Sequence, residues 1–245
     1  MTAPPFDFGD RTAVVTGAAG AIGAAVARRF ARAGARVVGL DVRPADDIIR
    51  CDVTDEASVG PVLRDVAARH GVTDLVHCAG VLSVGDVLDV PADEIRRVLN
   101  ANLMSAFIVA QAAGRLLRPG AAMTFLGSQA AAHGAPGWAA YCAAKAGVAR
   151  LVEALAKELG PGGIRVNAVC PGTVDSPMTE HAIGLTADRE HAGAAAIRRR
   201  YEQANPLRRM ASADEIAGVC LFLSSPLASF INGASIMVDG GERPG

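Results

Sequence analysis

The chain has 245 residues, of which 51% are hydrophobic but only 4% aromatic, and its formal net charge is -1. This length and apolar content suit one large α/β domain with a sizeable core. The near-zero charge argues against a general attraction to nucleic acid or acidic membranes.

Five scattered cysteines without a C-x-x-C pair argue against a disulfide framework and against a zinc or other metal site. The N-terminal segment 1–7 lacks the basic and apolar runs of a signal peptide, and apolar stretches are interrupted before they reach membrane-spanning length. We therefore expect a cytoplasmic protein with free thiols and no membrane partner.

Short β-branched segments alternate with longer Ala-rich segments of helical period along the whole chain. The pattern predicts strands at 12–16, 36–40, 47–51, 74–77, 123–126, 164–169 and 234–238. It predicts helices at 21–33, 56–69, 92–117, 138–159 and 213–223. This alternation indicates a doubly wound, Rossmann-type parallel sheet in a single domain spanning 1–245. A polar segment at 175–205 interrupts the rhythm, and we expect an irregular substrate lid there, after the sixth strand.

A glycine-rich turn, Thr-Gly-Ala-Ala-Gly-Ala-Ile-Gly, occupies residues 16–23 directly after the first expected strand. Gly17, Gly20 and Gly23 suit a tight turn, a close approach of backbone to pyrophosphate, and close packing of helix on strand. The helix that starts at Ala21 and Ile22 offers free N–H groups to phosphates. A glycine triplet alone is weak evidence for such a site, but its position between a strand and a helix indicates that it binds a dinucleotide.

Two aspartates at strand ends are candidates for the adenosine half of that site. Asp41 could accept hydrogen bonds from both ribose hydroxyls and would repel a 2′-phosphate, which favours NAD over NADP. It could also simply start a turn, and the nearby Arg43 could partly tolerate the phosphate. Asp52, beside Val53, could accept from the adenine amino group or serve only as a turn or capping residue.

Two further segments follow expected strands at the edge where ligands of such sheets bind. The segment 78–80 has small side chains, so a ribose could lie against its backbone. The segment 171–176 begins with Pro-Gly, which forces a turn, and it could hold a nicotinamide carboxamide. The residues concerned are Cys78, Ala79 and Gly80 after the fourth strand, and Pro171, Gly172, Thr173, Val174 and Ser176 after the sixth.

Tyr141 and Lys145 lie four residues apart in an expected helix, so they project from one face. An ammonium beside a phenol lowers its pKa, and Tyr141 could then exchange a proton with an alcohol as hydride moves. By itself, a Tyr-x-x-x-Lys pair occurs often by chance on helix surfaces. Ser128, after the fifth strand, could donate to the substrate oxygen. Asn102 could hold a water against Lys145 or simply face solvent.

Taken in order, these residues closely resemble the short-chain dehydrogenase/reductase family over 12–241. The resemblance rests on Thr-Gly-x-x-x-Gly-x-Gly at 16–23, Ala79-Gly80, Asn102, Ser128, Tyr141-x-x-x-Lys145, Pro171-Gly172 and Val-Asp-Gly-Gly at 238–241. It implies a catalytic tetrad of Asn102, Ser128, Tyr141 and Lys145, and a homotetramer or homodimer. Ala19 stands where NADPH-preferring members often carry a basic residue.

One position departs from the family pattern. Cys78 replaces the asparagine of the usual Asn-Ala-Gly, which should weaken the bracing of the loop near the adenosine. His77 precedes it, and we expect a hydrogen-bonded histidine at a strand end rather than a catalytic base.

The resemblance predicts an oxidoreductase that moves a hydride between NAD(H) and a secondary alcohol or ketone. Ala131, Ala132, Trp138 and Met178 suggest an apolar pocket for a cyclic or aliphatic alcohol. The 171–177 segment also resembles members that oxidise short hydroxy acids or deoxy-sugar acids, which need an arginine; the lid residues Arg198 or Arg208 could supply it. The alternatives are an NADPH-dependent 3-oxoacyl-thioester (acyl carrier protein) reductase and a non-catalytic dinucleotide sensor.

Overall fold

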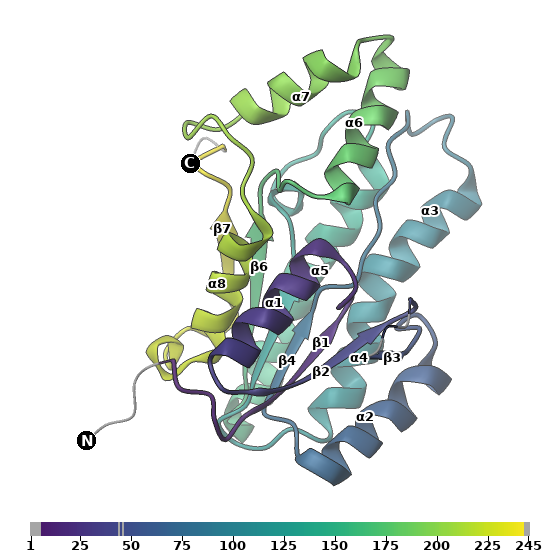
Figure 1. Ribbon diagram of the computed structural model, residues 1–245. Coiled ribbons are helices and arrows are strands. Elements are labelled where there is room, and N and C mark those ends of the chain that lie inside the picture. The colour runs from purple at the N-terminus through teal and green to yellow at the C-terminus, as the bar shows by residue number, and fades with distance from the viewer. Residues whose placement is uncertain (1–5, 44, 46, 243–245) are drawn as a thin grey trace.

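The computed structural model describes residues 6–43, 45 and 47–242. The described residues form one seven-stranded sheet in the order β3-β2-β1-β4-β5-β6-β7, and all neighbouring strands run parallel (Figure 1). The strands are β1 (Thr12–Thr16), β2 (Arg36–Asp41), β3 (Ile48–Arg50), β4 (Asp74–His77), β5 (Ala122–Leu126), β6 (Arg165–Pro171) and β7 (Ser235–Val238). The predicted doubly wound sheet is therefore confirmed.

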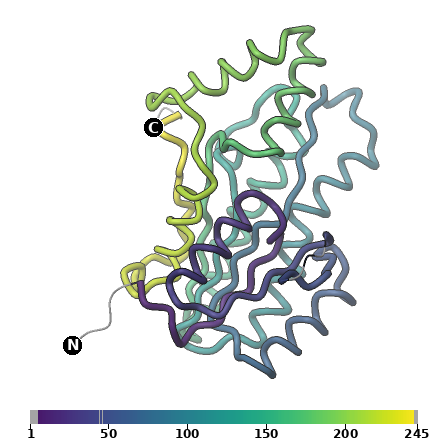
Figure 2. Tube along the Cα trace, in the orientation of Figure 1, coloured from purple at the N-terminus to yellow at the C-terminus, as the bar shows by residue number. Residues whose placement is uncertain are grey.

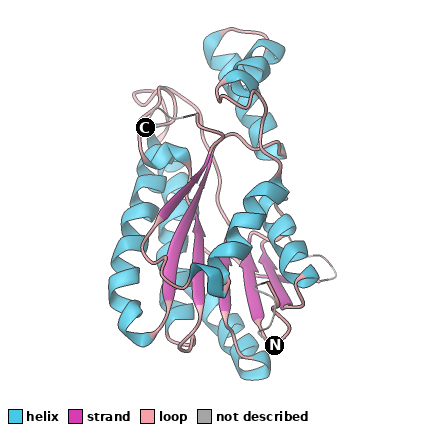
Figure 3. Ribbon diagram, turned by 90° about the vertical axis from the view of Figure 1, so that its left-hand side faces the viewer, coloured by secondary structure: helices cyan, strands magenta, loops and turns pink. Residues whose placement is uncertain are grey.

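Helices cover both faces of this sheet (Figure 3). They are α1 (Ala21–Arg32), α2 (Glu56–His70), α3 (Ala92–Leu99), α4 (Ser105–Gly114), α5 (Ala139–Leu159), α6 (Pro177–Glu190), α7 (Ala194–Gln203) and α8 (Ala213–Ser224). None of the helices formed by the described residues is both long and apolar enough to cross a bilayer.

Two buried clusters, one on each face, make up the core. Side chains of α2, α4 and α5 pack on one face of the sheet, and those of α1 and α8 pack on the other. Within β5, Met123 and Phe125 belong to the first cluster and Leu126 to the second, because successive strand residues point to opposite faces. A sheet covered on both faces explains the uninterrupted apolar strands.

The single helix predicted at 92–117 is wrong. A π-helical turn at Asn100–Met104 separates α3 from α4, and α4 ends at Gly114. A π turn adds one residue to the helical repeat, which the hydrophobic period does not reveal because both flanking helices keep their own pattern. The insertion matters for the site because it contains Asn102.

The irregular structure expected at 175–205 is also wrong, since α6 and α7 occupy most of this segment. Ser176 caps α6 by accepting a hydrogen bond from the Thr179 N–H at 3.2 Å, and Pro177 follows at a position that favours a helix start. Figure 2 shows the chain rising through α6 and α7 and returning to α8. The two helices share a small core of their own, which includes Ile183, Ala187 and Ile197.

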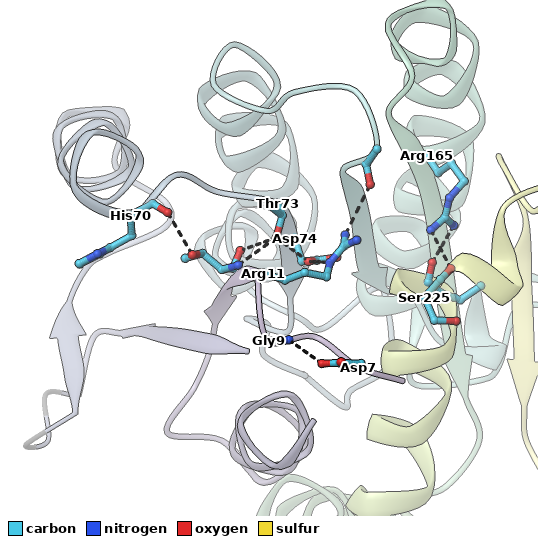
Figure 4. Close-up of polar contacts among 11 residues, drawn as sticks. Asp7, Gly9, Arg11, His70, Thr73, Asp74, Arg165 and Ser225 are labelled. Atoms are coloured by element: carbon cyan, nitrogen blue, oxygen red, sulfur yellow. Dashed lines mark hydrogen bonds and ion pairs between the residues drawn. The ribbon is translucent and has the colours of Figure 1, made fainter. Parts of the chain in front are cut away.

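The amino ends of the strands are held by buried ionic contacts (Figure 4). Arg11 pairs with both carboxylate oxygens of buried Asp74, at 2.6 and 2.8 Å, and the Thr73 hydroxyl donates to the same carboxylate at 2.8 Å. Burial raises the pKa of Asp74, and the Arg11 contact opposes this rise. Arg165 donates to the carbonyl of Ser225 at 3.3 Å, which links β6 to the end of α8. These contacts connect separate strands at the edge opposite the expected ligand site.

Candidate active site

A cavity of about 330 Å³ opens where β4, β5 and β6 reach their carboxyl ends. It brings together side chains from positions scattered across the sequence. The predicted site residues that line it are Ile22, Cys78, Gly80, Asn102, Ser128, Tyr141, Lys145, Pro171, Gly172, Thr173, Val174 and Ser176. The other predicted residues lie outside its lining, at or just after the carboxyl ends of β1 to β4: Gly17, Gly20, Ala21, Gly23, Asp41, Asp52, Val53 and Ala79.

The glycine-rich turn between β1 and α1 is tightly packed. Gly17 has a left-handed φ of 66°, and a Cβ on it would lie 2.7 Å from the backbone nitrogen of Ala79. A Cβ on Gly23 would lie 2.1 Å from the carbonyl oxygen of Gly17, so only glycine lets α1 start this close to the turn. Gly20 is the N-cap and has no side chain to cap the helix. The free N–H groups of the first turn of α1 therefore remain available to an anion.

Asp41 is fixed at the end of β2, where only 6% of it is exposed. Its carboxylate accepts hydrogen bonds from the backbone N–H groups of Ala19 and Arg43, each at 3.0 Å. The Arg43 Nε lies 3.4 Å from the same carboxylate, while most of that side chain is exposed. The glycine-rich turn is thus bonded directly to a carboxylate at the neighbouring strand end.

Asp52 forms a local turn. Its Oδ1 accepts from the Thr54 N–H at 2.9 Å and from the Thr54 hydroxyl at 2.7 Å, ahead of α2, which Asp55 caps. Val53 is buried in the core. The turn interpretation of Asp52 is confirmed, and a contact with adenine stays a prediction.

Lys145 lies on α5, one turn after Tyr141, and both line the cavity. Its Nζ donates to the Leu126 carbonyl at 2.7 Å and lies 5.6 Å from the centre of the Tyr141 ring. Only 4% of Lys145 is exposed, and burial lowers its pKa to about 8. The expected arrangement of the two residues on one face is confirmed.

The expectation that the neighbouring ammonium lowers the pKa of Tyr141 is wrong for the protein alone. Removal of water around the phenol raises its pKa to about 12, and the hydrogen bond with the Ser128 side chain opposes this rise only in part. The phenol also packs edge-on against Trp138, with ring centres 5.8 Å apart.

Asn102 does not face solvent, because only 1% of it is exposed. Its Nδ2 donates to the carbonyls of Val81 and Val98, at 2.7 and 2.9 Å. Its Oδ1 is buried and has no hydrogen-bond partner within the described part of the chain. A Cβ at Gly80 would lie 2.5 Å from this oxygen and 3.7 Å from the Lys145 Nζ, so Gly80 leaves room for both groups.

His77 is a buried structural residue, as expected. Its Nδ1 lies 2.8 Å from the Thr16 hydroxyl and its Nε2 lies 3.1 Å from the Ser105 hydroxyl. Burial lowers its pKa to about 3, and the Lys145 charge acts in the same direction. A histidine that stays neutral and uses both ring nitrogens inside the core is poorly suited to act as a base.

The cavity is predominantly apolar, as predicted, although its lining differs in part from the residues expected. Trp138 and Met178 line it, but Ala130 and Ala135 take the places expected for Ala131 and Ala132. Sequence reasoning missed five polar lining residues from four segments: Gln129 and His133 after β5, Thr179 in α6, Tyr201 in α7 and Glu242 after β7. Of these residues, the sequence could have pointed to Glu242, because it directly follows the Val-Asp-Gly-Gly motif at 238–241.

The lid arginines do not line the cavity. Arg198 forms ion pairs with Glu180 and Glu202 on the α6 and α7 surface instead. The cavity lining therefore gives no support to the suggestion that Arg198 or Arg208 binds a substrate carboxylate.

Known proteins resemble this chain over nearly its whole length. A family model described as enoyl-(acyl carrier protein) reductase matches residues 17–242. The D-threitol dehydrogenase of Mycolicibacterium smegmatis is 36% identical, with 96% of this chain and 95% of that protein covered. The cis-4-hydroxycyclohexanecarboxylate dehydrogenase of Sinomonas cyclohexanicum is 39% identical, with 96% and 97% covered. The ligand-free structure of the Thermoplasma acidophilum aldohexose dehydrogenase has a TM-score of 0.88 at 30% identity and covers 96% of both chains.

These matches extend over the strands, the glycine-rich turn and the cavity described above. The chain belongs to the short-chain dehydrogenase/reductase family. It is accordingly an oxidoreductase of CH–OH groups that works with a nicotinamide dinucleotide. The expected family and fold class are confirmed.

Proposed function

We propose that the protein transfers a hydride between NAD(H) and a secondary alcohol or the corresponding ketone. Tyr141 acts as the general acid and base, assisted by Lys145 and Ser128. The observation that carries this proposal is the gathering of Ser128, Tyr141, Lys145 and Asn102 around one cavity at the carboxyl edge of the sheet. The whole chain acts as one domain, in the cytoplasm, as a homotetramer or homodimer.

The residues at the carboxyl edge fit a dinucleotide. The turn at 16–23 would hold the pyrophosphate against the start of α1, whose first N–H groups are free of side-chain caps. Cys78, Ala79 and Gly80 would contact the ribose side, and the segment 171–176 would hold the nicotinamide. When bound, the nicotinamide supplies the hydride acceptor or donor.

The carboxylate of Asp41 supports NAD over NADP. It is held in place by two backbone N–H groups at the end of β2. A 2′-phosphate there would meet a fixed negative charge, whereas two ribose hydroxyls would donate to it. The Arg43 guanidinium already lies beside this carboxylate, and the negative charge of Asp41 weakens its attraction for a phosphate.

The pKa values of Tyr141 and Lys145 fit proton donation to a ketone oxygen. With a pKa of about 12, the Tyr141 phenol keeps its proton at neutral pH and can donate it to a ketone oxygen. With a pKa of about 8, most Lys145 is an ammonium at neutral pH, and its charge would stabilise the tyrosinate left behind. Ser128 would donate to the same substrate oxygen. The unpaired Asn102 Oδ1 is suited to accept from a water that returns protons by way of Lys145.

The names of the relatives support a hydroxyl-bearing substrate, since they are dehydrogenases of threitol, of a hydroxycyclohexane acid and of aldohexose. The acyl carrier protein in the family description keeps the NADPH-dependent 3-oxoacyl-thioester reductase as the second candidate. The Asp41 carboxylate argues against this second candidate.

A substrate panel followed at the NADH absorbance tests the proposal. The enzyme is mixed with cyclic and acyclic secondary alcohols and either NAD or NADP, and separately with acetoacetyl thioester and NADPH. We expect oxidation of secondary alcohols with NAD. Turnover confined to the thioester and NADPH would establish the second candidate, and no turnover with any pair would indicate a non-catalytic dinucleotide sensor.

A further inference from the structure

Glu242 lies in the candidate active site, although it belongs to no predicted site motif. It follows β7 and the turn at 239–241, and it lines the same cavity as Tyr141 and Ser128. Its carboxylate is seated against the Pro171-Gly172 turn, where a Cβ on Gly172 would lie 3.1 Å from the Oε2. A residue from the last strand thus reaches the end of β6.

The Glu242 Oε2 is buried and has no hydrogen-bond partner among the described residues. This sets it apart from Glu180, Glu190 and Glu215, each of which pairs with an arginine. A buried carboxylate oxygen without a donor is unfavourable, and a carboxylate can only accept hydrogen bonds. A water in the cavity or a donor group of a bound molecule would satisfy it, and a bound molecule that displaces the water must bring such a donor.

The charges in the cavity limit which donor this is. Among the described residues that line it, none is an arginine, and the one lysine donates to the Leu126 carbonyl. A substrate carboxylate beside Glu242 would meet a like charge, and the Lys145 ammonium that could offset this repulsion is already bound to the Leu126 carbonyl. An ammonium would share the cavity with Lys145 and with the positive charge of an oxidised nicotinamide. A neutral hydroxyl donates without either penalty.

A second unpaired oxygen supports the same class of ligand. The Oε1 of Gln129, on the segment that follows Ser128, is also buried without a partner in the part of the chain that the structure describes. Two acceptor oxygens, one after β5 and one after β7, therefore line one cavity, and both suit a molecule with several hydroxyl groups.

We propose that Glu242 is a specificity-determining residue that accepts a hydrogen bond from a second hydroxyl of the substrate and disfavours substrates that carry a carboxylate. The substrate is then a neutral diol or polyol. This inference rests on the proposed function and narrows its substrate class.

Kinetics with three related substrates test this inference in the full-length enzyme with NAD. The substrates are 2,3-butanediol, 2-butanol, which lacks the second hydroxyl, and 3-hydroxybutyrate, which carries a carboxylate. The variants are Glu242→Gln, which removes the charge but keeps an acceptor, and Glu242→Ala, which removes both. Glu158→Gln is the matched control, because it removes an exposed carboxylate about 20 Å along α5 from Lys145.

We expect the wild-type kcat/KM to be highest for the diol. In Glu242→Ala the ratio of kcat/KM for diol over 2-butanol should fall by about 10- to 100-fold, the range for a lost hydrogen bond to a charged group. Both Glu242 variants should gain activity on 3-hydroxybutyrate relative to 2-butanol. The Glu158→Gln control should keep the wild-type ratios.

Three results would overturn the inference. The first is a diol ratio that stays the same in Glu242→Ala, and the second is a wild-type preference for 3-hydroxybutyrate. The third is a rise in the Kd for NADH in both variants without a change in the diol ratio, which would assign Glu242 to the nicotinamide instead. A wild-type enzyme that oxidises none of the three and no other secondary alcohol of the wider panel would contradict the proposed function, and the inference with it. An enzyme that oxidises only secondary alcohols without a second hydroxyl would contradict the inference alone.

Discussion

Replacing Lys145 by Met should stabilise the protein at pH 7 while abolishing turnover. Burial lowers the pKa of Lys145 from 10.5 to about 8, so the folded protein holds an ammonium that the unfolded chain would solvate. At about 1.4 kcal/mol for each tenfold change in the protonation equilibrium, this corresponds to about 3 kcal/mol of stability. The lost hydrogen bond to the Leu126 carbonyl offsets about 1–2 kcal/mol. A net gain of about 1–2 kcal/mol remains, since Met is similar in length and apolar.

The pH dependence identifies the source of this gain. Below pH 8 the lysine is charged in both states, and the full penalty applies. Between pH 8 and 10.5 the folded state releases its proton before the unfolded state does, so wild-type stability rises through this group. The raised pKa values of Cys78 and Cys220 act the other way above pH 9. The informative quantity is therefore the stability difference between variant and wild type, which should shrink as pH rises through 8.

Urea unfolding at 25 °C, at pH values from 7 to 10, measures this difference. A gain of 1–2 kcal/mol would also raise the Tm by about 2–8 °C for a chain of this size. Lys157→Met is the matched control, because Lys157 is exposed on the same helix, and its removal should change stability by less than about 0.5 kcal/mol. A Lys145→Met variant that is less stable than wild type at pH 7, or a difference that does not vary with pH, would refute the reasoning.

Three further perturbations test the site and the core. Gly23→Ala places a Cβ 2.1 Å from the Gly17 carbonyl oxygen and should weaken NADH binding in fluorescence titration and lower stability in urea unfolding by about 1–3 kcal/mol. The control Gly184→Ala, inside α6 with no atom within 4 Å, should leave NADH binding unchanged and raise stability by about 0.5–1 kcal/mol. Because the pKa of His77 is lowered to about 3, the unfolded state takes up a proton first as pH falls below 6.5, so stability should fall by about 1.4 kcal/mol per pH unit through this group. A His77→Gln variant with the same acid sensitivity would contradict that assignment. Asp41→Ala should raise the Kd for NADH by about tenfold, as expected when a charged acceptor is lost, and should reduce the ratio of the Kd for NADPH to the Kd for NADH. Unchanged Kd values for both cofactors would contradict the role given to Asp41.

The sheet could be predicted from the sequence because a strand buried on both faces is a short apolar run, and β1 and β4 were bounded correctly. The Tyr141–Lys145 pair and Ser128 could be placed at one edge because parallel strands share their carboxyl ends. The π turn around Asn102 could not be predicted, since its signal is one inserted residue inside a continuous helical pattern.

The lid and the outer cavity escaped prediction for a different reason. The helices α6 and α7 pack on each other around a small core, so few of their residues are apolar and buried. Tyr201 and Glu242 reach the cavity from segments about 60 and 100 residues beyond Tyr141, and local patterns do not report such tertiary contacts. The pKa of Tyr141 depends on how closely protein surrounds the phenol, which is a property of the fold and not of the i, i+4 spacing.

The most direct test of the central claim is the steady-state kcat of Tyr141→Phe with a secondary alcohol and NAD, measured together with NADH binding by fluorescence titration. If Tyr141 moves the proton, loss of its hydroxyl should reduce kcat by at least about 10²- to 10⁴-fold and leave the Kd for NADH nearly unchanged. A Tyr141→Phe enzyme that turns over at the wild-type rate would contradict the account.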